Sequence, residues 1–148
     1  MQVQSYRDLE AWQLGMEFVV RVYGVTKDFP REEIYGLTSQ LRRAAVAIPS
    51  NISEGHQQGT KAYLHFVVMA LGSLAEAETQ LELSRRLRFG SESELAALAD
   101  FTVHVRRVVH GLRRSLAQRV DVGIGDRGSG IRDRGSGIRD RGPGIKST

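Results

Sequence analysis

The chain has 148 residues, of which 41% are hydrophobic and 26% are charged. These values are ordinary for a globular protein, and the length suits one domain with a single core. The chain has no cysteine, which excludes disulfides, thiolate catalysis and cysteine-based zinc sites. The N-terminus lacks the apolar segment of a signal peptide, and no apolar run is long enough to cross a bilayer. We therefore expect a cytoplasmic protein without a membrane anchor.

The formal net charge of +4 and the isoelectric point near 9.8 suggest a nucleic-acid partner. The excess of lysine and arginine is shared equally between residues 1–120 and residues 121–148, however, so neither part is strongly basic. Phosphate binding depends on how many cations face the phosphates together. Only a local cluster of cations would support a nucleic-acid partner.

The first helix is predicted to start at a capping box formed by Ser5 and Asp8 and to end near Lys27. It carries two apolar seams at helical spacing. The first seam comprises Leu9, Trp12, Met16, Val19 and Tyr23. The second seam comprises Leu14, Phe18, Val22 and Val25. A bundle core needs only one seam, so we predict that the first faces the core and that the second forms an oligomer interface. The alternative is a single broad core face.

Pro30 is predicted to lie in the first turn of the second helix, where its missing N–H is harmless. Pro49 lies further along the same helix and cannot donate a backbone hydrogen bond. A helix that passes through it must bend near Ala45 or stop at Ile48. We predict a bent helix with a C-terminal cap at Gly55.

The third helix is predicted to run from a cap at Thr60 to about Arg88. Gly72 lies in its middle, where glycine is less favourable than alanine by up to about 1 kcal/mol. We therefore expect another helix to pack closely against this glycine.

The fourth helix is predicted to start at a second capping box, formed by Ser91 and Glu94, and to end near Arg119. Its core seam is the most regular heptad in the chain and comprises Leu95, Leu98, Thr102, Val105, Val109, Leu112 and Leu116. The segment that follows repeats every seven residues as GIGDRGS, GIRDRGS and GIRDRGP. Its low apolar content predicts disorder. The expected organisation is a bundle over residues 1–120 and a disordered tail over residues 121–148.

Several stretches together resemble a known bacterial family in order and spacing over residues 5–118. They are LEAWQ (9–13), FP (29–30), YGLTSQLRRAA (35–45), IPSNISEG (48–55) and GSLAEAET (72–79). The resemblance is to the four-helix-bundle proteins encoded by intervening sequences of large-subunit ribosomal RNA genes, which are similar to the accessory variability proteins of diversity-generating retroelements. It implies an up-down-up-down bundle that assembles as a homopentameric barrel. The retroelement relatives further imply binding of nucleic acid and of a reverse transcriptase.

A polar set on the second and third helices is the first candidate for chemistry. Its members are Arg42, Arg43, Asn51, Glu54, Glu76 and Glu78. Paired carboxylates beside arginines can form an active site. We favour a structural interpretation, a buried network that fixes the register of the helices or the subunit interface.

The sequence offers no pattern for a metal or a cofactor. A di-iron bundle places a histidine three residues after a glutamate on two of its helices, and no acid in this chain has that neighbour. The histidines share no metal-ligand spacing, and the folded part has neither a phosphate-binding loop nor a nucleophile elbow. We therefore expect no metal, no cofactor and no enzymatic activity.

The second candidate is a basic ridge on the fourth helix, where no acid occurs between Phe101 and Val120. The ridge comprises Arg106, Arg107, His110, Arg113 and Arg114, and the end of the third helix extends it with Arg85, Arg86 and Arg88. Such a cluster, multiplied in an oligomer, suits phosphate binding. The alternative is a solvated helix face whose cations interact with the helix dipole. No aromatic residue is interleaved, so base stacking is not expected.

Together these patterns predict an all-α, antiparallel, up-down-up-down four-helix bundle that forms a homo-oligomer, a pentamer by resemblance. The predicted function is that of a non-enzymatic scaffold or accessory protein that binds structured RNA or DNA electrostatically. The alternative function is a purely structural or protein-recruiting oligomer.

Overall fold

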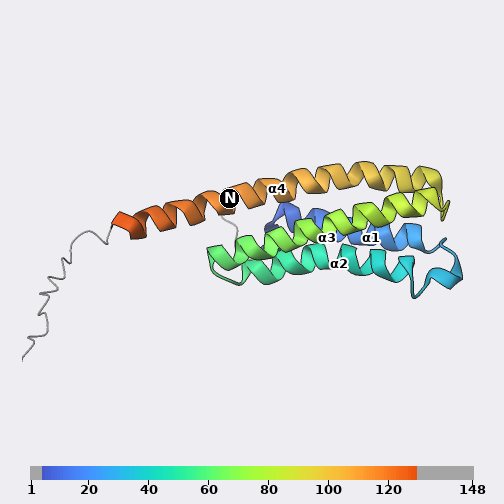
Figure 1. Cartoon of the computed structure of the whole chain (residues 1–148), viewed down its shortest axis with the longest axis horizontal. Coiled ribbons are helices and arrows are strands. Elements are labelled where there is room, and N and C mark those ends of the chain that lie inside the picture. The colour runs from blue at the N-terminus through green and yellow to red at the C-terminus, as the bar shows by residue number, and fades with distance from the viewer. Residues whose placement is uncertain (1–4, 130–148) are drawn as a thin grey trace, which may run out of the picture.

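The computed structural model describes residues 5–129, which form four α-helices and two short 3-10 turns without a strand. The helices are α1 (Glu10–Thr26), α2 (Leu37–His56), α3 (Thr60–Arg86) and α4 (Glu92–Ser129), and the turns are η1 (Tyr6–Asp8) and η2 (Arg31–Glu33). Consecutive helices run in opposite directions (Figure 1). Within the described residues, each helix contacts its two neighbours in the cyclic order α1, α2, α3, α4, and diagonal pairs do not touch. The predicted all-α four-helix bundle is confirmed.

The heptad of α4 faces the core as predicted. Six of its seven residues are buried, and the seventh, Leu112, is partly buried against them. The antiparallel neighbour α3 contributes a matching row of side chains at alternating spacings of three and four. That row comprises Tyr63, Val67, Ala70, Leu74, Ala77, Leu81 and Ser84. Regular apolar spacing on both helices therefore forms one continuous seam.

The seam of α1 that was predicted to form an oligomer interface lies in the core of the bundle. Phe18 and Val22 are fully buried in the bundle core, Val25 is nearly so, and Leu14 packs against that core. The predicted oligomer interface is therefore wrong, because its members fill the core of the chain itself. In the other seam, Met16 and Tyr23 are exposed, whereas Leu9, Trp12 and Val19 are partly buried. Spacing alone could not distinguish two equally apolar seams.

Helix α2 continues through Pro49 to His56, as the prediction of a helix passing through the proline requires. The Asn51 side chain donates a 2.8 Å hydrogen bond to the Ala47 carbonyl, within the turn that the proline disturbs. Gly55 does not cap this helix. It lies inside α2, where a Cβ atom would come within 2.7 Å of Phe66 Cβ and 2.9 Å of Tyr63 Cδ2. The glycine is required because α2 and α3 approach closely at this point. The bend near Ala45 stays a prediction.

Several predicted helix ends shift. The Ser5–Asp8 capping box exists, but it caps η1, and α1 starts only at Glu10. Gly59 is the N-cap of α3, so Thr60 is its first helical residue and does not cap it. Ser91 does cap α4, accepting a 3.3 Å hydrogen bond from the Glu94 amide.

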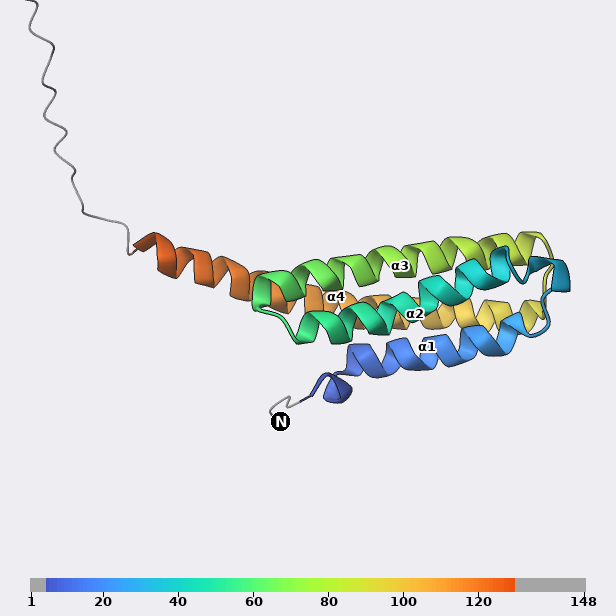
Figure 2. The same cartoon turned by 90° about the horizontal axis from the view of Figure 1, so that it is seen from below.

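Helix α4 extends beyond its predicted end. It continues from Arg119 to Ser129 and passes the ends of α1 and α3 (Figures 1 and 2). The glycine-rich repeat therefore does not end the helix at residue 121, and the rest of the predicted tail lies outside the described residues.

The expected close packing at Gly72 does not occur. Gly72 is exposed, and a Cβ atom there would meet nothing within 4 Å among the described residues. The tight glycine of the bundle is Gly55, which the sequence analysis assigned to a helix end. Over the part of the chain that the structure describes, no helix combines the length and the hydrophobicity that crossing a bilayer requires.

Candidate nucleic-acid interface

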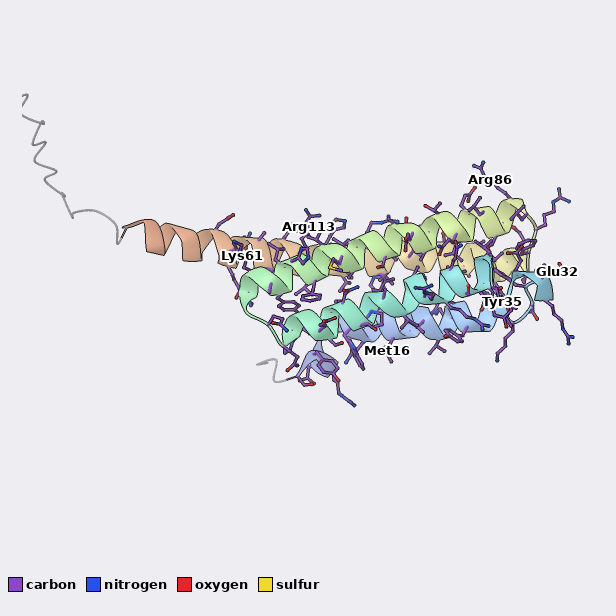
Figure 3. All side chains as sticks on the ribbon, turned by 60° about the horizontal axis from the view of Figure 1, so that its bottom comes forward. Met16, Glu32, Tyr35, Lys61, Arg86 and Arg113 are labelled. Carbon is purple, nitrogen blue, oxygen red and sulfur yellow. The ribbon has the colours of Figure 1, made fainter. Side chains whose placement is uncertain are left out.

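The residues of the predicted basic ridge follow α4 and the end of α3. Figure 3 shows Arg86 and Arg113 projecting from the same side of the bundle, while Met16 lies on the opposite side. The ridge is therefore a real surface feature of the α3–α4 side. Some members of the ridge, however, already form ion pairs with carboxylates of the same chain, and others do not.

Three of the eight predicted residues make ion pairs within the chain. Arg85 donates to Glu92 at 3.0 Å and Arg86 to Glu82 at 3.0 Å, while Arg106 pairs with Glu78 across the α3–α4 contact. The hydrogen bond to the Glu92 carboxylate, together with its negative charge, raises the pKa of Arg85. These pairs cancel most of the positive charge near the α3–α4 turn.

A second group of the ridge has no such compensation. Arg107, Arg113 and Arg114 are exposed, His110 is partly exposed, and none of them makes an ion pair among residues 5–123. We call these four residues the α4 basic cluster. The facing part of α3, residues 60–75, contains no acid. Arg107 and Arg114 are seven residues apart in the sequence, which corresponds to about 10 Å along the helix.

Arg88 stands apart from this cluster. It lies in the turn between α3 and α4, in the left-handed region with φ of 58°. Helix α4 runs away from that turn toward the other end of the bundle (Figure 2), and the cluster lies in the middle of this helix, between Arg107 and Arg114. Of the eight predicted residues, four therefore form the α4 basic cluster. Three others are neutralised by carboxylates, and Arg88 lies apart from the cluster.

The predicted buried network on α2 and α3 does not form. Arg43, Glu54 and Glu76 are exposed, and Glu78 pairs with Arg106 of α4 and with neither arginine of α2. Arg43 and Glu76 line an open hollow between α2 and α3 of about 400 Å³. The prediction was wrong because the helical register places these side chains on the outer surface.

Arg42 is the member of that set with a structural role. Its Nε donates a 2.8 Å hydrogen bond to Thr26 Oγ1, and its guanidinium carbon lies 4.5 Å from the Tyr23 ring centroid. Thr26 is buried at the end of α1 and donates in turn to the Val22 carbonyl at 2.7 Å. Arg42 thus joins α2 to the end of α1.

An aromatic row at the end of the bundle was missed by the sequence analysis. Neighbouring rings in the order Trp12, Tyr6, His56 and Tyr63 lie 5.4, 6.5 and 5.7 Å apart between centroids. The Tyr63 hydroxyl is buried without a hydrogen-bond partner. Burial raises the pKa of Tyr63 to about 12, and the positive charge of Arg119 partly opposes this shift. The row joins two stretches that are far apart in the sequence, residues 6–12 and 56–63, so no local motif could have indicated it.

No group of three or more potential metal ligands occurs among the described residues. The arginines of the α4 basic cluster are exposed and uncompensated among the described residues, as electrostatic binding of phosphates requires.

The chain matches the sequence model of a known protein family. The model of the 23S rRNA-intervening sequence protein matches residues 7–111. The chain belongs to this family. The matched residues include α1, α2 and α3 completely and the first part of α4. They contain Arg107 and His110 of the α4 basic cluster, whereas Arg113 and Arg114 lie beyond the match.

Solved structures support the fold of this intervening-sequence family member. A protein of unknown function from the S23 ribosomal protein family of Bacteroides thetaiotaomicron is 20% identical, with a TM-score of 0.64. The similarity covers 70% of this chain and 97% of that chain. At this identity it establishes the shared bundle alone. None of the curated proteins matches the chain.

Proposed function

We propose that this chain is a non-enzymatic, cytoplasmic homo-oligomer that binds structured RNA or DNA through the α4 basic cluster. The observation that supports the proposal is the absence of a carboxylate partner for these cations among the described residues. A solvated cation releases counterions from a phosphate backbone, whereas an arginine already paired with glutamate gains less. Binding would therefore be governed by charge and shape.

Oligomerisation would multiply the cluster. The resemblance to the retroelement accessory proteins favours a pentamer, in which each α4 contributes four cationic or titratable groups. Each additional cation that faces a phosphate strengthens binding and steepens its salt dependence. A reverse transcriptase partner follows from the same resemblance and is proposed on that ground alone.

Paired arginine variants test the nucleic-acid function. We compare Arg107→Ala/Arg114→Ala with Arg85→Ala/Arg86→Ala, which removes the same charge from residues already paired with glutamates. The measurement is binding of nuclease-treated protein to labelled structured RNA and duplex DNA at low and moderate salt. We expect the first variant to lose affinity and its salt slope to fall by about one per lost phosphate contact. The second variant should bind nearly as the unmodified chain does.

Two outcomes would contradict the proposal. The first is that the unmodified chain shows no binding at low salt. The second is an equal loss of affinity in both variants, which would mean that net charge, and not the cluster, governs binding. Light scattering on the same samples checks that the oligomer remains intact.

An alternative function, recruitment of a protein partner, is favoured by a different surface. Ile34 and Tyr35 are adjacent in the connection before α2, and both are exposed, Tyr35 to 94%. Contiguous exposed apolar surface is typical of protein contacts. Retention of a partner by the unmodified chain but not by Ile34→Ser/Tyr35→Ser, with nucleic-acid binding unchanged, would support this alternative.

A further inference from the structure

His110 lies at the centre of the arginines of α4. Two arginines precede it by four and three residues, and two follow it by three and four: Arg106, Arg107, Arg113 and Arg114. Residues at these spacings are neighbours on a helix surface, with Cβ atoms about 5–6 Å apart. Arg106 and Arg113 lie about 40–60° to one side of His110 around the helix. Arg107 and Arg114 lie about the same angle to the other side. The imidazole is therefore flanked by arginines both along and around α4.

Within α4 the imidazole has no carboxylate beside it. His110 is partly exposed and makes no ion pair within the part of the chain that the structure describes. No acid occurs in the sequence between Phe101 and Val120. The ring can therefore meet a phosphate from solution without first leaving an acidic partner.

The charged groups of α3, which packs beside α4, do not offer a free carboxylate at this point either. Glu78 is engaged by Arg106, and Glu76 lines the hollow between α2 and α3. Before Glu76, the side chains of α3 that can carry a charge near neutral pH are Lys61 and His65. The surroundings of the imidazole on this side are therefore basic or already paired.

The other neighbour of α4, helix α1, lies on the far side of the imidazole. The guanidinium carbon of Arg21 lies 4.1 Å from the Phe101 ring centroid, so Phe101 marks the side of α4 that faces α1. His110 follows Phe101 by nine residues, which corresponds to about 180° around the helix. The acids of α1 are Glu10 and Glu17, of which Glu17 pairs with Arg21. They belong to the side of α4 opposite His110.

We propose that His110 makes nucleic-acid binding proton-linked, so that the α4 basic cluster holds a phosphate backbone more tightly when this histidine is protonated. The inference rests on the proposed nucleic-acid function and adds a regulation of the same site. Histidine is the side chain whose charge ordinarily changes between pH 5 and 8. A phosphate held by the flanking arginines brings negative charge beside the imidazole and favours its protonated form. Binding therefore takes up a proton, and affinity rises as the pH falls.

Protonation changes what the ring offers to a polyanion. A neutral imidazole has one N–H donor, whereas the imidazolium has two N–H donors and a positive charge. His110 then joins Arg107, Arg113 and Arg114 as a fourth cation of the cluster. Each cation that faces a phosphate adds to the salt dependence of binding. Affinity and salt dependence should consequently increase together in mildly acidic solution.

Binding at two pH values tests the inference. Labelled duplex DNA is titrated with the nuclease-treated full chain at pH 6 and at pH 8, each at several salt concentrations. We expect about three- to tenfold higher affinity at pH 6, with a salt slope steeper by about one for each additional phosphate contact. His110→Gln, whose side chain stays neutral, should lose this gain. His110→Lys carries a permanent cation and should show the steeper slope at both pH values.

Two other histidines provide matched controls. His65→Gln and His104→Gln alter exposed histidines on α3 and α4 that lie outside the cluster, so both variants should keep the whole gain. Calorimetry of binding in two buffers with different ionisation enthalpies measures the protons taken up. The uptake should be positive for the unmodified chain and fall toward zero in His110→Gln. Circular dichroism at both pH values checks that every variant is folded.

The outcomes separate this inference from the function on which it rests. No binding at either pH would overturn the nucleic-acid function and the inference with it. Binding with equal affinity and equal salt slope at both pH values would overturn the inference alone. A gain at pH 6 that survives in His110→Gln would also overturn it, because another group would then take up the proton.

Discussion

Arg106 of α4 forms an ion pair with Glu78 of α3, and this contact separates the neutralised arginines of the basic ridge from the α4 basic cluster. Both side chains are partly exposed, at 39% and 29%, so the pair contributes little to stability. Its main consequence is electrostatic, because it keeps Arg106 from acting as a free cation beside Arg107.

Replacing Glu78 should therefore strengthen nucleic-acid binding. In Glu78→Gln, Arg106 is released, and we expect affinity at low salt to rise roughly two- to fivefold, with a steeper salt dependence. The free energy of unfolding should change by less than about 1 kcal/mol. Glu17→Gln is the matched control, since it removes the same charge and releases Arg21 on α1 instead. An equal gain in both variants would assign the effect to net charge.

Two glycines in adjacent helices should respond oppositely to the same substitution. Gly55→Ala places a methyl group within 3 Å of Tyr63 and Phe66, so we expect a loss of about 1 to 3 kcal/mol of stability. Gly72→Ala places it in open space on an exposed part of α3, so we expect a gain of about 0.5 to 1 kcal/mol. Urea unfolding followed by circular dichroism measures both. A destabilised Gly72→Ala would indicate that another chain packs there.

Tyr63 should make stability fall in alkaline solution. The pKa of its hydroxyl is about 12 in the folded chain, against an ordinary value of 10. The folded state therefore holds this proton more tightly than the unfolded state does. The stabilisation is fully present below pH 10 and is lost as the pH rises from 10 to 12, by about 2 to 3 kcal/mol at most.

Tyr63→Phe isolates this effect. The variant should lack the additional alkaline loss, and near neutral pH it should be as stable as the unmodified chain or more so, because it removes a buried hydroxyl without a partner. Unfolding in urea at pH 8 and at pH 11 compares the two chains. Parallel pH dependence in both would refute the assignment to Tyr63.

Removing the end of α4 should leave the bundle intact. The last buried side chain of α4 among residues up to 123 is Leu116, and Val122 is 73% exposed. A chain that ends at Asp121 should therefore keep its free energy of unfolding within about 0.5 kcal/mol. A larger loss would show that the removed residues contact the bundle or a neighbouring copy.

The regular seams could be predicted from the sequence, because one face of α4 is apolar and the opposite face is not. The sequence could not predict which face of α1 points to the core, since both of its seams are apolar. Gly15 indicates the correct face, but the prediction did not use it. It shares a face with Phe18, and a Cβ atom there would lie 3.4 Å from Ile48 and Pro49, so α2 lies against that face.

The site was harder to predict than the fold. Spacing placed the arginines of α4 on one ridge, but the Glu78 partner of Arg106 lies 28 positions earlier in the chain, on another helix. The aromatic row depends in the same way on rings that meet only after folding. Helix length also escaped prediction, because glycine content suggested an end where α4 continues to Ser129.

The projecting end of α4 gives the bundle a polarity. Residues 121–129 add about 14 Å of helix at one end, and the free cations lie in the middle of α4, between the α3–α4 turn and that end. If neighbouring copies point the same way, every projection gathers at a single rim, and the opposite rim receives the α3–α4 turns with the paired Arg85 and Arg86. The α4 basic clusters then form a belt between the two rims. Such an assembly would have two different ends, with its free cations between them.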